Sequence, residues 1–304
     1  MVDLTAKSNA HIAKYFSGKK ALIIDPTGVN RTSIKKMLLS LGLTHKDIGN
    51  VDTIEGANDY FEIHKPDLLF VKEELDDGKG LDILEKHLKK VPNRLKGSFF
   101  LISEDNSLTE STLVLDTECD GILIVPFTIQ GIETTLLDAL KRKMKPSPYL
   151  KAVELGKASY ITGDFDAALE KFDEAAEVNP KPVLANFYRS LILMEQGSQD
   201  DAVAVLLENL EQNEKHYKTL NSLGQIYYEK GQYPEAYEME CRILENYPLN
   251  AEKIPILTRL SVQTEHYEDI TNFANLFKGL NKVGENIQKF MCAGVAICGR
   301  FFVM

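Results

Sequence analysis

The loop DPTGVNRTS, residues 25–33, carries a glycine and several hydroxyl side chains, which are residue types that can hold a phosphate ahead of a helix. It lacks both the G-x-G-x-x-G pattern of dinucleotide sites and the G-K-[ST] ending of P-loops. Turn geometry accounts for Pro26 and Gly28, and a helix N-cap accounts for Asn30. We therefore expect no flavin or nucleotide cofactor at this loop.

Cysteine and histidine residues form no pattern typical of a metal site. No two cysteines have C-x-x-C spacing, and the six histidines include no H-E-x-x-H motif. We expect no metal, no cofactor, and reduced, mostly buried thiols in a cytoplasmic protein. The four cysteines are Cys119, Cys241, Cys292 and Cys298.

The elements around the loop alternate between short apolar runs and helical stretches. This alternation predicts an α/β doubly wound domain built on a five-stranded parallel sheet. The predicted strands are residues 20–25, 48–54, 67–72, 97–103 and 121–125. The predicted helices are residues 33–42, 56–64, 80–90, 107–116 and 129–143.

The details of residues 19–143 resemble the receiver domain of two-component response regulators. Pro66 and Asp67 precede the third strand, Gly80 opens the third helix, and VPF ends the fifth strand where that family has lysine-proline-phenylalanine. The resemblance implies strand order 2-1-3-4-5, with the working site at the carboxyl ends of the strands. It also implies a cis bond between Val125 and Pro126.

The same resemblance places a phosphorylation pocket at Asp25, Pro26, Lys72, Ser103 and Val125. Receivers use two acids after strand one, an acceptor aspartate on strand three, a hydroxyl on strand four and a lysine on strand five. Here Pro26 replaces the second acid, Lys72 the acceptor and Val125 the lysine, while Asp25 and Ser103 remain. Since a carboxylate nucleophile and Mg²⁺ are both needed for phosphoryl transfer to this domain, the resemblance implies a pseudo-receiver.

Lys72 is expected to pair with Asp25 instead, with its ammonium where the metal would lie. The alternative register, one residue later, would put Glu73 at the acceptor position. The spacing from Pro66 and to Gly80 favours Lys72. The acidic residues that follow are expected to form a solvated loop, and they are Glu73, Glu74, Asp76 and Asp77.

A period of 34 residues organises the chain from about residue 149 to residue 248. Gly163, Gly197 and Gly231 recur at this spacing, and Ala168, Ala202 and Ala236 recur in the same register. Such a period is typical of a helix–turn–helix repeat. The glycines supply the left-handed conformation that ends the first helix, the alanines give the second helix a flat contact, and Pro180 and Pro248 stop that second helix. A small residue earlier in the repeat, as at Gly156 and Gly224, lets the two helices approach closely.

These residues resemble the tetratricopeptide (TPR) family, whose arrays bind proteins or peptides in a concave groove. The match is incomplete, because Ala152, Asn186 and Leu220 replace an early large aromatic and a fourth repeat lacks the glycine. The resemblance implies an all-α TPR solenoid with a partner-binding groove. Its lining would be Lys157, Tyr160, Phe187, Tyr188, Glu195, Asn221, Gln225, Tyr228 and Arg259. Several of these, Phe187 and Tyr160 above all, could instead be packed between helices.

The predicted organisation has three parts: a leader helix in 1–18, the pseudo-receiver in 19–144 and the TPR array in 145–304. The repeats fall near 149–182, 183–216 and 217–250, with a degenerate repeat at 251–284 and a final helix at 285–304. That final helix is apolar on most faces, which favours a truncated chain, with homodimer formation as the alternative.

The net charge of −10 argues against nucleic acid as a partner, including an RNA-binding array. The apolar run 290–299 is too short for membrane insertion, and the N-terminus has no signal peptide pattern.

We expect a non-catalytic bacterial signalling scaffold, not an enzyme, whose partners are proteins such as a sensor kinase or another regulator. The alternative is a working response regulator whose phosphorylation gates the array.

Overall fold

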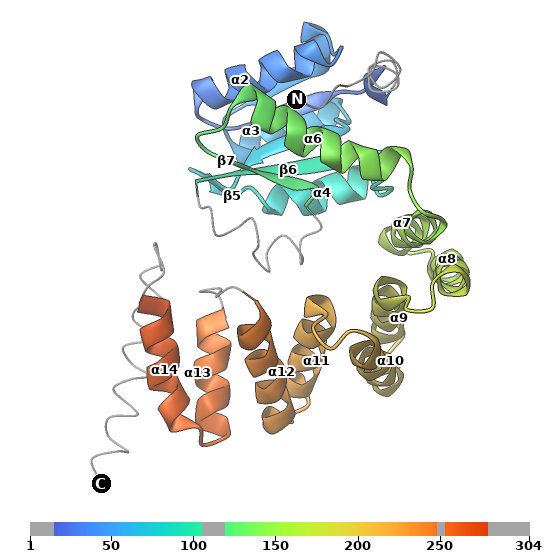
Figure 1. Ribbon diagram of the computed structural model, residues 1–304, viewed down its shortest axis with the longest axis vertical. Coiled ribbons are helices and arrows are strands. Elements are labelled where there is room, and N and C mark those ends of the chain that lie inside the picture. The colour runs from blue at the N-terminus through green and yellow to red at the C-terminus, as the bar shows by residue number, and fades with distance from the viewer. Residues whose placement is uncertain (1–14, 105–118, 248–252, 279–304) are drawn as a thin grey trace. The chain divides into compact units, whose positions relative to one another are not determined.

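The computed structural model describes residues 15–104, 119–247 and 253–278 (Figure 1). These residues belong to two compact units, one reaching Tyr188 and the other starting at Arg189. The leader helix predicted in 1–18 lies mostly outside the described residues. The helix predicted at 107–116 and the final helix at 285–304 lie wholly outside them.

The first unit is built on a five-stranded parallel sheet of order β2-β1-β3-β6-β7, which is the predicted order 2-1-3-4-5. The strands β1, β3 and β6 are mostly apolar and almost entirely buried, whereas β2 (IGNV) is partly exposed. Buried parallel strands need apolar side chains on both faces, which explains why these runs do not alternate with polar residues. The strands are β1 (Ala21–Ile24), β2 (Ile48–Val51), β3 (Leu68–Lys72), β6 (Ser98–Ser103) and β7 (Gly121–Ile124).

Helices cover both faces of the sheet. α2 (Gly28–Ser40) and α6 (Ile129–Met144) pack side by side and share one core cluster with the sheet (Figure 1). α3 (Ile54–Ile63) and α4 (Asp82–Lys90) lie on the other face. The Val125–Pro126 bond is cis, which confirms the prediction made from the VPF segment.

A small hairpin after β3 was not predicted. β4 (Glu74–Leu75) and β5 (Gly78–Lys79) pair antiparallel where the sequence indicated a solvated acidic loop. The Asp77 carboxylate accepts the N–H groups of Ile54 and Glu55 at 2.9 and 3.0 Å, so it caps α3 from outside that helix. These backbone bonds hold the pKa of Asp77 below its usual range. Glu74, Asp76 and Asp77 are exposed as predicted, whereas Glu73 is partly buried, and Asp77 has a structural role.

Helix pairs follow the sheet. The first unit contains α7 (Pro148–Ile161), α8 (Phe165–Val178) and the start of α9 (Val183–Glu195), within which the unit boundary falls. The second unit continues with α10 (Gln199–Gln212), α11 (Tyr217–Glu229), α12 (Tyr233–Asn246), α13 (Ile254–Gln263) and α14 (Tyr267–Lys278). A three-residue segment separates α6 from α7, and the hydroxyl of Ser147 caps α7 by accepting the Leu150 N–H.

The roles predicted for the periodic glycines and alanines are confirmed. Gly163, Gly197 and Gly231 adopt φ of +79°, +79° and +73° after successive first helices. The alanines at 168, 202 and 236 are fully buried. A Cβ on Gly156 would lie 2.5 Å from the Phe172 ring, so only glycine permits the observed approach of α7 to α8.

The fourth repeat keeps the turn without the glycine. Glu265 lies 34 residues after Gly231 and adopts φ of +63°. The His266 N–H still donates to the Ser261 carbonyl at 2.8 Å, as in the glycine-containing turns. The packing of α13 on α14 therefore holds a backbone conformation that a residue with a Cβ disfavours.

None of the helices in residues 15–104, 119–247 and 253–278 has the length and apolar character needed to span a membrane.

Candidate functional site

The position that resembles a phosphorylation pocket is filled by contacts of the chain with itself. Asp25 is completely buried at the end of β1. One carboxylate oxygen accepts the Thr27 N–H at 2.7 Å, and the other accepts the Asn30 side-chain amide at 2.9 Å. Arg31 donates to the Asp25 backbone carbonyl. Because both oxygens already accept local donors, this carboxylate serves the β1–α2 turn.

Two sequence predictions about this turn were wrong. Asn30 does not cap α2, because the helix begins at Gly28 with Thr27 at the cap position, and Asn30 bonds Asp25 from the first turn. Lys72 does not pair with Asp25. Its ammonium lies 2.7 Å from a Glu104 carboxylate oxygen instead, directly after β6.

The remaining positions of the pocket make contacts within the chain or lie at its surface. Ser103 is buried at the end of β6, and its hydroxyl donates to the Glu73 carboxylate at 2.5 Å. Val125 is partly buried against the core cluster, and Pro26 is exposed. Within the described segments, no three histidine, cysteine, aspartate or glutamate side chains come close enough together to hold a metal ion. The residues present bind one another.

Backbone contacts fix the position of Lys72 relative to β6 and to Gly80. Lys72 is the last residue of the strand and is paired with Ile102 across β6. A Cβ on Gly80 would lie 2.0 Å from the Lys72 carbonyl oxygen, so the chain closes tightly over Lys72 only because residue 80 is glycine. This contact gives the spacing between Lys72 and Gly80 a physical cause.

The predicted groove residues of the first unit are packed. Lys157 is 4% exposed and its ammonium lies 2.5 Å from Glu154, while Tyr188 is 8% exposed. The Tyr188 ring stacks on Phe172 at 5.8 Å and meets Tyr160 edge-on at 5.9 Å. Phe187 is likewise buried. Lys157 and Tyr188 therefore stabilise the helix packing, and the prediction that they line an open groove was wrong.

The predicted residues of the second unit are more accessible. Glu195 and Gln225 are exposed. The Arg259 guanidinium lies over the Tyr228 ring, 6.0 Å from its centroid, and donates to the Tyr228 hydroxyl at 2.6 Å. Arginine keeps further N–H donors when one is used, so this pair offers a cation, an aromatic face and free donors together.

Lys253 extends this group and was missed in the sequence analysis. Its ammonium donates to the Asn221 side chain at 2.5 Å and pairs with buried Glu240 at 2.8 Å. Lys253 lies 32 residues after Asn221, so the contact joins successive repeats. The repeat spacing alone could have suggested a neighbour for Asn221, but not its identity.

Comparisons with known proteins agree with the repeat geometry. The profile of a family described as tetratricopeptide repeat matches residues 153–216. The chain carries TPR repeats. They follow a receiver-like domain, and repeats of this kind are protein-binding modules.

Two curated relatives match parts of the chain. One is Photosystem I assembly protein Ycf3 of Prochlorococcus marinus (strain MIT 9211), 30% identical over 119 residues, or 37% of this chain and 65% of the relative. The other is Protein STIP1 homolog of Dictyostelium discoideum, 28% identical over 95 residues, or 29% of this chain and 17% of the relative. The chain thus spans under two thirds of either relative, and their activities are not transferred to it.

Solved receiver structures are similar over the first part of the chain. The chemotaxis response regulator CheY4 of Vibrio cholerae covers 40% of this chain and 98% of its own, with 14% identity and a TM-score of 0.35. A response regulator receiver domain from Clostridium thermocellum covers 41% and 97%, with 21% identity and a TM-score of 0.34. Because these scores are low, the fold assignment rests on the observed strand order.

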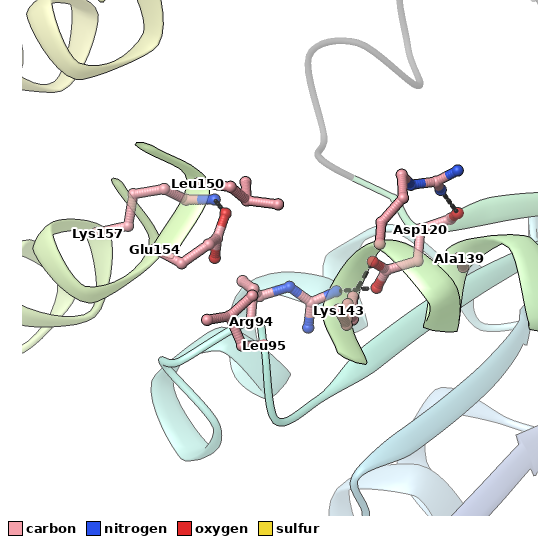
Figure 2. Close-up of a pocket in the computed structure, with 9 residues that line it drawn as sticks. Arg94, Leu95, Asp120, Ala139, Lys143, Leu150, Glu154 and Lys157 are labelled. Carbon is pink, nitrogen blue, oxygen red and sulfur yellow. Dashed lines mark hydrogen bonds and ion pairs between the residues drawn. The ribbon is translucent and has the colours of Figure 1, made fainter. Parts of the chain in front are cut away.

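A pocket that the sequence did not indicate lies beside α7. Its lining includes Arg94 from the segment after α4, Asp120 directly before β7, and Lys143 of α6, together with Glu154 and Lys157 of α7 (Figure 2). Asp120 accepts Arg94 at 2.6 Å and Lys143 at 2.6 Å. No motif connects these positions, because they come from four separate segments.

Proposed function

We propose that this chain is a non-catalytic signalling scaffold of the bacterial cytoplasm. Its repeats would bind partner proteins, and its receiver-like domain would accept no phosphate. The observation that carries the proposal is the state of the vestigial pocket. Lys72, which we assign to the acceptor position, pairs with Glu104, while both oxygens of Asp25 accept donors from its own turn.

Electrostatics supports this reading of the pocket. A phosphoryl acceptor needs a carboxylate nucleophile, and its metal needs oxygen ligands that are not already used. Lys72 has no nucleophilic oxygen, and its positive charge would repel Mg²⁺ from Asp25. No residue is therefore proposed as catalytic.

The accessible residues of the second unit support protein binding. Tyr228 and Arg259 combine aromatic area with hydrogen-bond donors, a combination common at protein interfaces. Asn221 and Gln225 come from the same helix as Tyr228, and Lys253 connects that helix to the next repeat. A protein or peptide segment that carries acceptor groups would fit this chemistry. A sensor kinase or another regulator is the first class of partner to test.

The test is affinity capture with the full chain as bait. Arg259→Gln would remove the exposed guanidinium, and Arg242→Gln on α12 is the control, because it removes one cation from the same unit at a different helix. We expect the parent chain and the control to retain a defined protein. Arg259→Gln should retain at least tenfold less of it. Equal retention by all three would contradict binding at this surface.

Acetyl phosphate separates the proposal from its alternative. If the chain is a working response regulator, treatment with acetyl phosphate and Mg²⁺ would change the amount of partner retained. The scaffold proposal expects the same retention with and without treatment. Light scattering of the purified chain tests whether the partner includes a second copy of itself.

A further inference from the structure

The pocket beside α7 is lined by charged side chains. Its volume is about 190 Å³, which is roughly the space of six water molecules. Charged side chains from α6, α7 and the loop after α4 surround it (Figure 2). The side chains of Arg94, Lys143, Lys157 and Glu154 are each nine-tenths buried or more. The pocket itself is open to solvent, and Arg142 at its edge is exposed.

Positive charge exceeds negative charge around the pocket. Four cations line it against two carboxylates, a formal excess of two positive charges in a chain whose net charge is −10. Asp120 is shared by Arg94 and Lys143, so it does not neutralise both. Arg142 donates only to the Asp120 backbone carbonyl, at 3.2 Å, and has no carboxylate partner among the described residues. An anion would offset this excess.

The side chain of Lys143 lies within this excess of positive charge. Burial, together with the nearby Arg94 charge, lowers the pKa of Lys143 to about 8, although Asp120 opposes the shift. Its ammonium also donates to the Gly97 carbonyl at 2.5 Å, so its position is fixed. A second negative charge near Lys143 would stabilise the protonated form.

On the α7 side of the pocket, Glu154 has a buried acceptor atom that lacks a donor within the described part of the chain. One of its oxygens accepts Lys157, but the Oε2 atom is buried and has no hydrogen-bond partner within the described part of the chain. A buried acceptor without a donor costs free energy, and a ligand that brings an N–H or O–H group would remove that cost. The pocket therefore offers a site for an anion and, separately, a site for a donor.

We propose that this pocket binds a small carboxylate that also carries an ammonium or hydroxyl group. The carboxylate would lie near Arg142 and Lys143, and the ammonium or hydroxyl would donate to Glu154 Oε2. Four-carbon dicarboxylates with one such substituent have a suitable size and carry net negative charge. This site is separate from the proposed protein-binding surface, and its ligand would contact both α6 and α7.

Three matched compounds test the proposal with the full chain by calorimetric titration. L-aspartate, L-malate and succinate share one carbon skeleton and carry an ammonium, a hydroxyl or a hydrogen at the second carbon. We expect aspartate and malate to bind at least tenfold more tightly than succinate, because only they donate to Glu154. Inorganic phosphate is included as a plain anion. Tighter binding of phosphate than of all three carboxylates, or no binding at millimolar concentration, would overturn the proposal.

Variants then assign the two ends of the ligand. Arg142→Gln should weaken all three compounds at least tenfold, whereas Lys141→Gln should leave them unchanged, because Lys141 is exposed on the same helix and pairs with Asp138. Glu154→Gln should abolish the preference for aspartate over succinate. If Glu154→Gln fails to fold, the comparison of aspartate with succinate in the parent chain still decides the outcome. A parent chain that binds succinate as tightly as aspartate would contradict the role of Glu154.

Discussion

The Lys72 ammonium lies 2.7 Å from the Glu104 carboxylate, at the end of strand β3. The pair joins the ends of β3 and β6, and the lysine side chain is 12% exposed while the glutamate is 66% exposed. An ion pair with one exposed partner contributes little to stability. Under the proposed function its consequence is chemical, since it fixes a cation at the position that we assign to the acceptor.

Restoring the acceptor alone should not restore phosphorylation. We expect Lys72→Asp to gain no phosphoryl group from acetyl phosphate and Mg²⁺. Pro26 still replaces the second acid, Val125 still replaces the lysine, and Asp25 still accepts Thr27 and Asn30. Intact mass measurement checks this, with Lys72→Ala as the control. A phosphoryl group on the aspartate variant but not on the alanine variant would mean that the rest of the pocket is competent.

Stability should fall as pH decreases through the ordinary titration range of histidine. His87 is fully buried; in its neutral form Nε2–H donates to the Pro66 carbonyl at 3.1 Å while Nδ1 faces the Arg94 guanidinium at 3.4 Å. Burial, with Arg94 adding to it, lowers the pKa of His87 from 6.5 to about 3. Between these pH values the unfolded chain binds a proton that the folded chain does not. The contribution of His87 to the free energy of unfolding is therefore complete above pH 6.5 and declines below it, by at most about 1.4 kcal/mol per pH unit.

Denaturant unfolding of His87→Gln between pH 4.5 and 7 tests this assignment. The variant should lose much of the pH dependence that the parent chain shows in this range. His45→Gln, which alters a surface histidine, should retain the parent's dependence. Equal slopes for the parent and His87→Gln would show that other groups cause the acid sensitivity.

Two equivalent glycines should respond oppositely to alanine. A Cβ at Gly156 would lie 2.5 Å from the Phe172 ring, so Gly156→Ala should destabilise the chain by about 1–3 kcal/mol through overpacking. At Gly224 the nearest atoms would lie at 3.4 and 3.5 Å, which is close to ordinary contact. Gly224→Ala should therefore be neutral or stabilising by up to about 1 kcal/mol, because alanine favours helix. Thermal and denaturant unfolding measure both, and similar losses would refute the packing argument.

The fourth repeat should be stabilised by the glycine that it lacks. Glu265→Gly would relieve a positive φ that a residue with a Cβ disfavours, and we expect a gain of about 0.5–1 kcal/mol. Glu268→Gly, in the first turn of α14, is the matched control and should lose about 1 kcal/mol. Denaturant unfolding compares both variants with the parent chain. A loss of stability in both variants would contradict the strain at residue 265.

The sequence predicted the features that depend on local backbone physics. A positive φ requires glycine, so Gly163, Gly197 and Gly231 indicated the turns directly. Buried parallel strands require continuous apolar runs, so the order of elements and the sheet followed. Glu265 shows the limit of this approach, because the turn persists there although its sequence signal is lost.

Side-chain partners were predicted less well. The pairing of Lys72 with Asp25 failed because Asp25 finds donors within its own turn, and because Glu104 was not considered as a partner. Lys157 was assigned to an open groove by its place in the repeat, but it is buried with Glu154. The pocket near Asp120 had no sequence signal, since residues far apart in the chain create it.

The intact mass of the full chain after incubation with acetyl phosphate and Mg²⁺ tests the central claim most directly. A working receiver domain treated in parallel shows that the reagent is active. The account predicts an unchanged mass for this chain, because Lys72 occupies the acceptor position and both oxygens of Asp25 are engaged. An added phosphoryl group on an acidic residue, with Glu73 the first to examine, would contradict it.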